Sequence, residues 1–123
     1  MLVIDDAEDN RSIYAFFLQH EGFEVAVAAD GEAGVDQAQQ GEFDVIVMDL
    51  TMPKMDGWEA TRRLKSDVRT RTIPIIVLTG YPSTTGEREA RAAGSDRYLT
   101  KPCLPETLVE EIRRVLACRT PPS

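Results

Sequence analysis

The sequence predicts one α/β domain built on a parallel β-sheet. Segments typical of strands alternate with segments typical of helices, and the connections between them are short. This alternation favours a parallel sheet, because each intervening helix returns the chain to the start of the next strand. Three strand-like runs are apolar, rich in β-branched residues and closed by a polar side chain: residues 1–4 before Asp5, 45–48 before Asp49 and 75–78 before Thr79.

The first strand is expected at residues 1–4 and the first helix at residues 7–21. The apolar side chains expected on the buried face of this helix are Ile13, Phe16 and Phe17. Gly22 follows directly, and a glycine just past the last turn commonly ends a helix.

The second strand, residues 24–28, alternates polar and apolar side chains more than the other strands do. It is therefore expected at an edge of the sheet. A helix over residues 32–40 follows, entered at Asp30 and left at Gly41. The third strand is the apolar run at residues 45–49.

The third helix is expected at residues 58–66, where Asp56 and Glu59 have the spacing of a capping box for its first turn. A second β-branched run then predicts the fourth strand at residues 73–79.

The last third of the chain completes the alternation. A polar helix over residues 85–93 contains Gly86 and is expected to be the least stable helix. A short fifth strand at residues 97–100 precedes a helix at residues 105–116 that begins with proline in its first turn. One face of this last helix is apolar and consists of Leu108, Val109, Ile112, Val115 and Leu116.

Composition indicates one acidic domain. The 123 residues are 42% hydrophobic and carry a formal net charge of −7, which suits a single core and repels phosphate backbones. Direct nucleic-acid binding is therefore not expected, and no apolar run is long enough to span a membrane.

Cys103 and Cys118 lack metal-ligand spacing, so reduced thiols and a cytoplasmic location are expected. The domain is assigned to residues 1–118, and residues 119–123 are interpreted as a tail or the start of a linker.

Polar residues that end the strands are expected to meet at one edge of the sheet, where open α/β sheets bind ligands. They are Asp5, Asp6, Asp49, Thr79 and Lys101. Three converging carboxylates repel one another unless a cation lies among them, and hard oxygen ligands suit Mg²⁺. With Lys101 as a second positive charge, this set predicts phosphoryl transfer to the Asp49 carboxylate. Taken alone, the Asp5-Asp6 pair has a second interpretation, in which Asp6 caps the first helix and Asp5 faces solvent.

Six short motifs stand in an order and spacing that is specific as a set. They are Leu2-Val3-Ile4-Asp5-Asp6, Val47-Met48-Asp49-Leu50, Met52-Pro53-Lys54-Met55-Asp56-Gly57, Leu78-Thr79-Gly80, Ala93-Gly94-Ser95-Asp96 and Tyr98-Leu99-Thr100-Lys101-Pro102. On these motifs the chain resembles the receiver domains of two-component response regulators, and the resemblance covers essentially all of its length.

The resemblance implies a role for each acidic residue of the site. Asp49 would accept the phosphoryl group. Asp5 and Asp6 would hold Mg²⁺, together with the Asp49 carboxylate and the backbone carbonyl of Thr51. The implied fold is flavodoxin-like: a doubly wound, three-layer α/β/α arrangement with five parallel strands in the order 2-1-3-4-5.

The resemblance also implies a conformational switch and its partners. Thr79 and Lys101 would bind phosphoryl oxygens, and Tyr98 would be the aromatic side chain that moves when Thr79 does. A sensor histidine kinase or a histidine phosphotransfer protein would donate the phosphoryl group. A downstream protein would bind the surface formed by the fourth helix, fifth strand and fifth helix, with no direct nucleic-acid or membrane partner. The chain would be a monomer or weak homodimer and would catalyse only its own phosphorylation and dephosphorylation.

Three other interpretations predict a different kind of protein. The chain could be a receiver domain excised from a hybrid histidine kinase or a larger response regulator. A phosphatase of the dehalogenase type would place a second acid two residues after the nucleophile, where Thr51 stands. A flavodoxin-like cofactor binder would need a phosphate-binding loop of Ser, Thr or Gly after the first strand, where Asp5 and Asp6 stand.

Overall fold

A computed structural model describes residues 1–5, 7–49, 57–79, 88, 92, 94–100 and 104–119. The strands are β1 (Leu2–Ile4), β2 (Ala26–Ala28), β3 (Ile46–Asp49), β4 (Ile75–Thr79) and β5 (Arg97–Thr100). The helices within the described residues are α1 (Glu8–His20), α2 (Gly31–Gln40), α3 (Gly57–Ser66) and α5 (Pro105–Arg119). The polar helix expected at residues 85–93 falls mostly outside the described residues.

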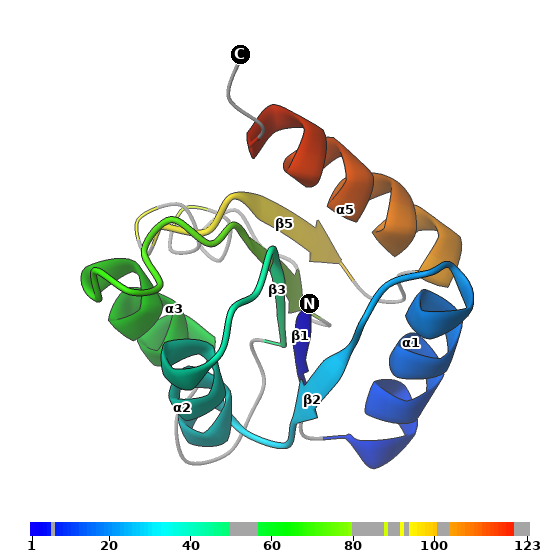
Figure 1. The fold of residues 1–123 in the computed structure, drawn as a ribbon, viewed down its shortest axis with the longest axis horizontal. Helices are drawn as coiled ribbons and strands as arrows, with labels where there is room; N and C mark the ends of the chain where they lie inside the picture. Colours follow the sequence, from blue (N-terminus) through cyan, green and yellow to red (C-terminus); the bar gives the residue numbers. More distant parts are fainter. Residues whose placement is uncertain are drawn as a thin grey trace.

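The five strands form one parallel sheet in the order β2-β1-β3-β4-β5. This confirms both the predicted order and the prediction that the second strand lies at an edge. In Figure 1, α2 and α3 cover one face of the sheet, while α1 and α5 cover the other. Ile4 pairs with Met48 and Thr79 pairs with Thr100, so neighbouring strands end close to one level at the carboxyl edge.

Alternation along each strand sends buried side chains into two separate apolar layers. The layer under α2 and α3 contains Leu2, Ile4, Ile46, Met48, Ile75 and Val77 from the sheet. The layer under α1 and α5 contains Val3, Val47, Ile76 and Leu78. Full burial of an aliphatic side chain of this size contributes about 1.5–3 kcal/mol, so these layers hold the strand ends in place.

The buried face of α1 differs from the one predicted. Tyr14 and Leu18 are buried, whereas Ile13 is 57% exposed and Phe16 is 76% exposed; Phe17 is partly buried. Two sets of apolar residues in this helix have helical spacing, and the sheet contacts the set that contains Tyr14. The prediction for Ile13 and Phe16 was therefore wrong.

The predicted ends of the first two helices agree with the structure to within one residue. Gly22 has a φ of +97°, in the left-handed region where glycine is favoured, directly after the Glu21 C-cap of α1. The Asp30 side chain caps α2 by accepting a hydrogen bond of 2.8 Å from the Ala33 backbone N–H, and Gly41 ends that helix. The last helix continues to Arg119, beyond the predicted end at residue 116, and its predicted apolar face is buried or partly buried.

Gly34 allows α2 to approach β1 closely. It is buried, and a Cβ atom at this position would overlap the Ile4 side chain, with Cγ1 only 2.7 Å away and Cδ1 nearer still. Ile4 is fully buried and directly precedes Asp5. The contact between α2 and β1 therefore helps to position the first residue of the candidate site.

The described helices include none that is both long enough and apolar enough to cross a lipid bilayer.

Candidate functional site

Asp5 lies at the carboxyl end of β1 and is only 2% exposed. Its Oδ1 atom accepts a hydrogen bond of 2.9 Å from the Ala7 backbone N–H, just before α1 begins. The Arg11 Nη1 atom donates to the Asp5 backbone carbonyl oxygen at 2.8 Å. The Asp5 side chain is thus held by the backbone at the start of α1, and its carbonyl group is held by the Arg11 side chain.

The interpretation in which Asp5 faces solvent is wrong, because the side chain is buried. The N-cap residue of α1 is Ala7, whose own side chain makes no cap hydrogen bond. Asp6 lies outside the described residues, and so do Thr51 and Lys101.

Asp49 is the last residue of β3 and is also only 2% exposed. The β1–β3 register pairs Ile4 with Met48, so the next residues along, Asp5 and Asp49, come level on adjacent strands. Two carboxylates buried side by side repel one another and are costly to desolvate without compensation. This is the arrangement predicted for the acidic half of the site.

Thr79 and Tyr98 lie on the next two strands. Thr79 ends β4 and pairs with Thr100, the last residue of β5, so its backbone reaches the same edge of the sheet as Asp49. Tyr98 lies in β5, is partly buried and packs against the apolar layer under α2 and α3. Its hydroxyl oxygen is buried and finds no hydrogen-bond partner in the part of the chain that the structure describes.

The donor set fits Mg²⁺, which binds carboxylate and carbonyl oxygens. Asp5 and Asp49 supply two buried carboxylates on neighbouring strands, where a cation would relieve their repulsion. Within the described residues no three Asp, Glu, His or Cys side chains form a metal-binding group. The third predicted carboxylate, Asp6, is among the residues that are not described.

A cluster of polar contacts, which the sequence analysis did not predict, links α3 to Asp96, the residue just before β5. The Lys65 Nζ atom donates to the backbone oxygens of Arg71 and Ile73, at 3.3 and 2.9 Å, and forms an ion pair with Asp96 at 3.1 Å. The same Asp96 oxygen accepts a 2.8 Å hydrogen bond from the backbone N–H of Ile75, the first residue of β4. Asp96 belongs to a motif noted in the sequence, but its Lys65 partner lies 31 residues away and has no local signal.

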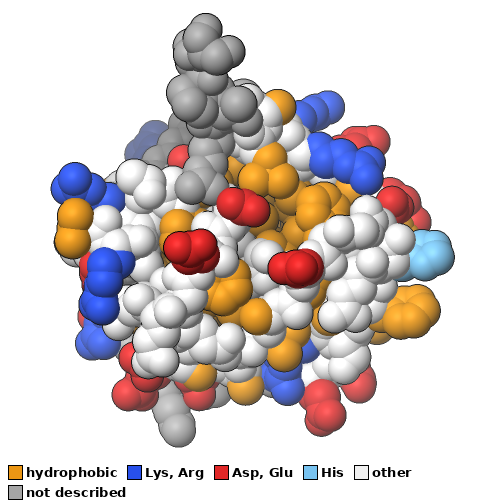
Figure 2. All heavy atoms as spheres, viewed as in Figure 1, with side chains coloured by type: hydrophobic (Ala, Val, Ile, Leu, Met, Phe, Trp, Pro, Cys, Tyr) orange, Lys and Arg blue, Asp and Glu red, His pale blue; other side chains and the backbone are white. Residues whose placement is uncertain are grey.

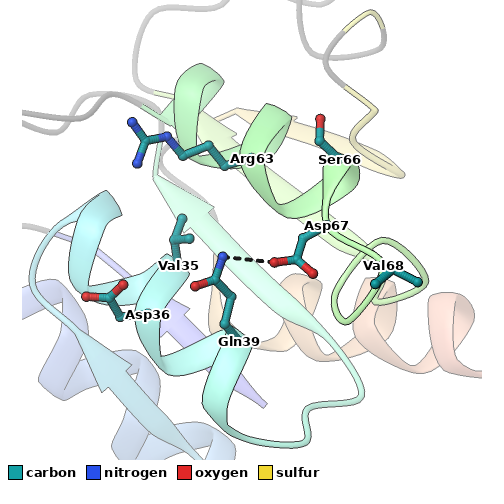
Figure 3. A pocket seen from close by; sticks show the side chains of 7 residues that line it. All are labelled: Val35, Asp36, Gln39, Arg63, Ser66, Asp67 and Val68. Atoms are coloured by element: carbon teal, nitrogen blue, oxygen red, sulfur yellow. Dashed lines mark hydrogen bonds between the residues drawn. The ribbon is translucent and has the colours of Figure 1, made fainter.

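A hollow of about 530 Å³ lies between α2 and α3, but it is not the predicted site (Figure 3). Its lining residues are Val35, Asp36, Gln39, Arg63, Ser66, Asp67 and Val68. They come from the middle and the C-terminal half of α2, the C-terminal half of α3 and the turn after it, whereas Asp5 and Asp49 precede helix N-termini. The Gln39 side chain donates to Asp67 across the hollow at 3.0 Å.

Asp67 beside this hollow has a strongly lowered pKa. Hydrogen bonds from the Arg69 side chain, and next from its backbone N–H, lower the pKa of Asp67 from 3.8 to about 2. The Arg69 side chain is exposed, whereas the Asp67 side chain is only 16% exposed, and the pair stabilises the turn after α3 locally.

Comparison with known proteins identifies the family of this chain. Residues 1–113 match the family model described as the response regulator receiver domain. The chain belongs to that family. Protein PilH of Pseudomonas aeruginosa is 37% identical to this receiver domain over 117 residues, which span 95% of this chain and 97% of PilH. The transcriptional regulator RpaA of Synechocystis is 34% identical over 116 residues, which make up 48% of that longer protein.

Solved structures show the same fold. Chemotaxis protein CheY4 of Vibrio cholerae is 37% identical to this receiver domain, with a TM-score of 0.89, and the match covers 93% of this chain and 95% of CheY4. The receiver domain of the sensor histidine kinase PA1611 of Pseudomonas aeruginosa is 30% identical, with a TM-score of 0.87, and the match covers 94% of this chain and 95% of that one. That structure is described with a magnesium ion coordinated in its active-site cleft.

Proposed function

We propose that this receiver domain accepts a phosphoryl group on Asp49, with Mg²⁺, and thereby changes its binding to a downstream protein. The observation that carries the proposal is the burial of Asp5 and Asp49 side by side at the ends of β1 and β3. Buried carboxylates of like charge are costly in a purely structural role, but they suit a site that binds a cation and then a phosphoryl group. Family membership and the magnesium-containing structure of the PA1611 receiver domain support the same chemistry.

In the proposed reaction, a carboxylate oxygen of Asp49 attacks the phosphorus atom of a phosphohistidine on a kinase or phosphotransfer protein. A phosphorus–oxygen bond forms and the phosphorus–nitrogen bond breaks. The electron pair of the broken bond stays on the imidazole nitrogen of the donor, and Asp49 becomes an acyl phosphate. Mg²⁺, when bound, would neutralise charge on the phosphoryl oxygens.

Asp5, Asp6, the Asp49 carboxylate and the Thr51 backbone carbonyl are the residues proposed to hold the metal. Arg11 contributes indirectly, because its hydrogen bond to the Asp5 carbonyl oxygen fixes the backbone that presents the Asp5 carboxylate.

Lys101 and the Thr79 hydroxyl are proposed to bind phosphoryl oxygens, and Tyr98 to respond to the change. A complete shift of a two-state equilibrium from 1:99 to 99:1 needs about 5.5 kcal/mol of differential stabilisation. One charge-assisted hydrogen bond supplies about 1.5–3 kcal/mol. The Thr79 contact alone is therefore too weak, and the Lys101 ion pair is required for a complete switch.

The buried Tyr98 hydroxyl supports a switch at this position. Among the described residues this hydroxyl has no hydrogen-bond partner, and a buried polar group left in that state costs about 1–3 kcal/mol, so a rearrangement that gives it a partner is favoured. The target is proposed to bind the face formed by the segment at residues 85–93, β5 and α5. On this proposal the protein acts in the cytoplasm and has no substrate other than its own phosphodonor.

The test is phosphorylation by acetyl phosphate in the presence of Mg²⁺, followed by intact mass measurement. The wild type should gain one phosphoryl group, and Asp49→Asn or addition of a chelator should abolish the gain. Asp44→Asn is the matched control, because Asp44 is exposed just before the other end of β3. Asp44→Asn should phosphorylate as the wild type does, and an undiminished gain in Asp49→Asn would refute the assignment.

A further inference from the structure

We propose that the face formed by α2 and α3 binds a second copy of this chain. This surface, here called the α2–α3 face, consists of five exposed side chains on the two helices: Glu32, Asp36, Arg62, Arg63 and Ser66. The hollow of about 530 Å³ lies between these helices, and Val68 at its margin is 72% exposed (Figure 3). A partner seated here would cover an apolar side chain as well as charged ones.

The two helices carry opposite charges on this face. Glu32 and Asp36 on α2 form no ion pair with any described residue, and neither does Arg62 on α3. Arg63 binds Glu59 of its own helix through Nε at 3.2 Å, and its side chain remains 55% exposed. Figure 2 shows basic side chains along the margin where Figure 1 places α3. An acidic ridge on α2 thus lies beside a basic ridge on α3.

The same contrast divides the whole chain. Residues 1–60 contain 14 of the 21 acidic residues but only 2 of the 14 basic ones. A uniformly acidic partner would be attracted by the α3 ridge and repelled by the α2 ridge, and the reverse holds for a uniformly basic partner. The partner must therefore present both signs in two adjacent rows. A second α2–α3 face does so, and this charge complementarity argues for a second copy as the occupant.

The ridges match when the two copies are related by a two-fold axis parallel to the helices. Because α2 and α3 both connect parallel strands, they run in the same direction, and the hydrogen bond from Gln39 to Asp67 joins their C-terminal ends. Asp36 and Arg63 each lie about one turn before that bond, so they stand at the same height. Rotation about the axis then places Asp36 of each copy opposite Arg63 of the other, which is the reciprocity that isologous contacts require.

The expected dimer is weak. Two short helices packed on two others bury less than the roughly 1,200–2,000 Å² of stable interfaces, and each copy carries a net charge of −7. We expect a dissociation constant on the order of 10⁻⁴–10⁻³ M. The carboxyl edges of the two sheets point in the same direction and lie outside the contact. Dimer formation therefore goes beyond the proposed function and does not depend on it.

Sedimentation equilibrium of the full chain from about 10 μM to about 1 mM tests the proposal. The weight-average mass of the wild type should rise with concentration from 13.7 kDa towards twice that value. Asp36→Arg and Arg63→Asp should each weaken association at least about tenfold, because each places like charges opposite one another. Both positions are exposed, so the variants should fold, which circular dichroism checks.

Glu110→Arg is the matched control, because it changes the net charge as Asp36→Arg does but lies on α5, which covers the other face of the sheet. It lowers the general repulsion between copies and should associate at least as strongly as the wild type. Asp36→Arg lowers that repulsion equally, so its weaker association would come from the contact itself.

An equimolar mixture of the two single variants tests the identity of the occupant. Asp36→Arg on one copy and Arg63→Asp on the other restore both opposite-charge pairs, so the mixture should associate about as strongly as the wild type although neither variant does so alone. A wild type that stays monomeric at 1 mM, or a mixture that stays monomeric, would overturn the proposal. Slower phosphorylation of Asp36→Arg by a histidine phosphodonor protein, with unchanged sedimentation, would assign the α2–α3 face to that donor and also overturn it.

Discussion

Gly34 offers a direct test of how closely α2 must approach the strand that carries Asp5. Substitution by alanine has two opposing effects. In the interior of an exposed helix, alanine is more favourable than glycine by about 0.8–1.0 kcal/mol. Here the added methyl group would overlap the Ile4 side chain, with Cγ1 2.7 Å away, and both residues are buried. Overpacking of this kind costs about 1–3 kcal/mol.

We therefore expect Gly34→Ala to destabilise the domain by up to about 2 kcal/mol, in place of the gain that helix propensity predicts. Ile4→Val removes the Cδ1 atom, which the new methyl group would overlap most, and costs about 0.5–1.5 kcal/mol by itself. The double variant should be more stable than the sum of the two effects predicts, with a coupling free energy of about 1 kcal/mol.

Urea unfolding followed by circular dichroism measures these differences, which correspond to midpoint shifts of roughly 0.5–1 M. Gly22→Ala is the matched control, because no atom lies within 4 Å of a Cβ at Gly22 and the expected strain comes only from its φ of +97°. Ile4→Val should not relieve the cost of Gly22→Ala. A stabilising Gly34→Ala, or equal coupling of Ile4→Val to both glycine variants, would refute the argument.

Three further predictions concern the links around the sheet and the switch. Lys65→Met should lower the free energy of unfolding by about 1.5–3 kcal/mol, because it removes a cation that binds two backbone carbonyl oxygens and a carboxylate. Urea unfolding measures the loss, and Arg69→Met, which removes an exposed side chain, should have a smaller effect in the same experiment. Because the pKa of Asp67 is lowered, the contribution of this carboxylate to stability is present above pH 3.8 and is lost as the pH falls to about 2. A carboxyl NMR titration should find the Asp67 midpoint near 2 in the wild type and at a higher pH in Arg69→Met. Equal midpoints would contradict the assigned cause. Thr79→Ala should still be phosphorylated but should transmit less of the signal. Phosphorylation should therefore change amide hydrogen exchange in residues 80–98 much less in this variant than in the wild type. Equal changes in both proteins would show that the signal travels by another route.

The strands and most helix ends could be predicted because their signals are local. Buried parallel strands require continuous β-branched runs, and these occur at β1, β3 and β4. Gly22 and Asp30 mark helix ends by backbone freedom and side-chain capping, both of which depend on few neighbours.

The buried face of α1 could not be predicted in the same way. Tyr14 and Leu18 are four residues apart, and Ile13 and Phe16 are three apart, so both pairs have helical spacing and periodicity alone does not distinguish the two faces. Contact with the sheet decides between them. The ion pair between Lys65 and Asp96 depends in the same way on packing between distant segments.

For the candidate site, the sequence predicted which residues end the strands, and the register shows that Asp5 and Asp49 come level at one edge. The burial of both carboxylates is a property of the folded chain that a strand pattern alone does not specify. The roles of Asp6, Thr51 and Lys101 remain predictions, because these residues lie outside the described part of the chain.

Locating the phosphoryl group within the chain tests the central claim most directly. The wild type would be phosphorylated with acetyl phosphate and Mg²⁺, reduced with borohydride to convert the acyl phosphate to a stable alcohol, digested and sequenced by tandem mass spectrometry. The proposed function predicts a single modified position, Asp49, and loss of the modification when a chelator is present. Modification at Asp5 or at any other acid, with Asp49 unmodified, would contradict it.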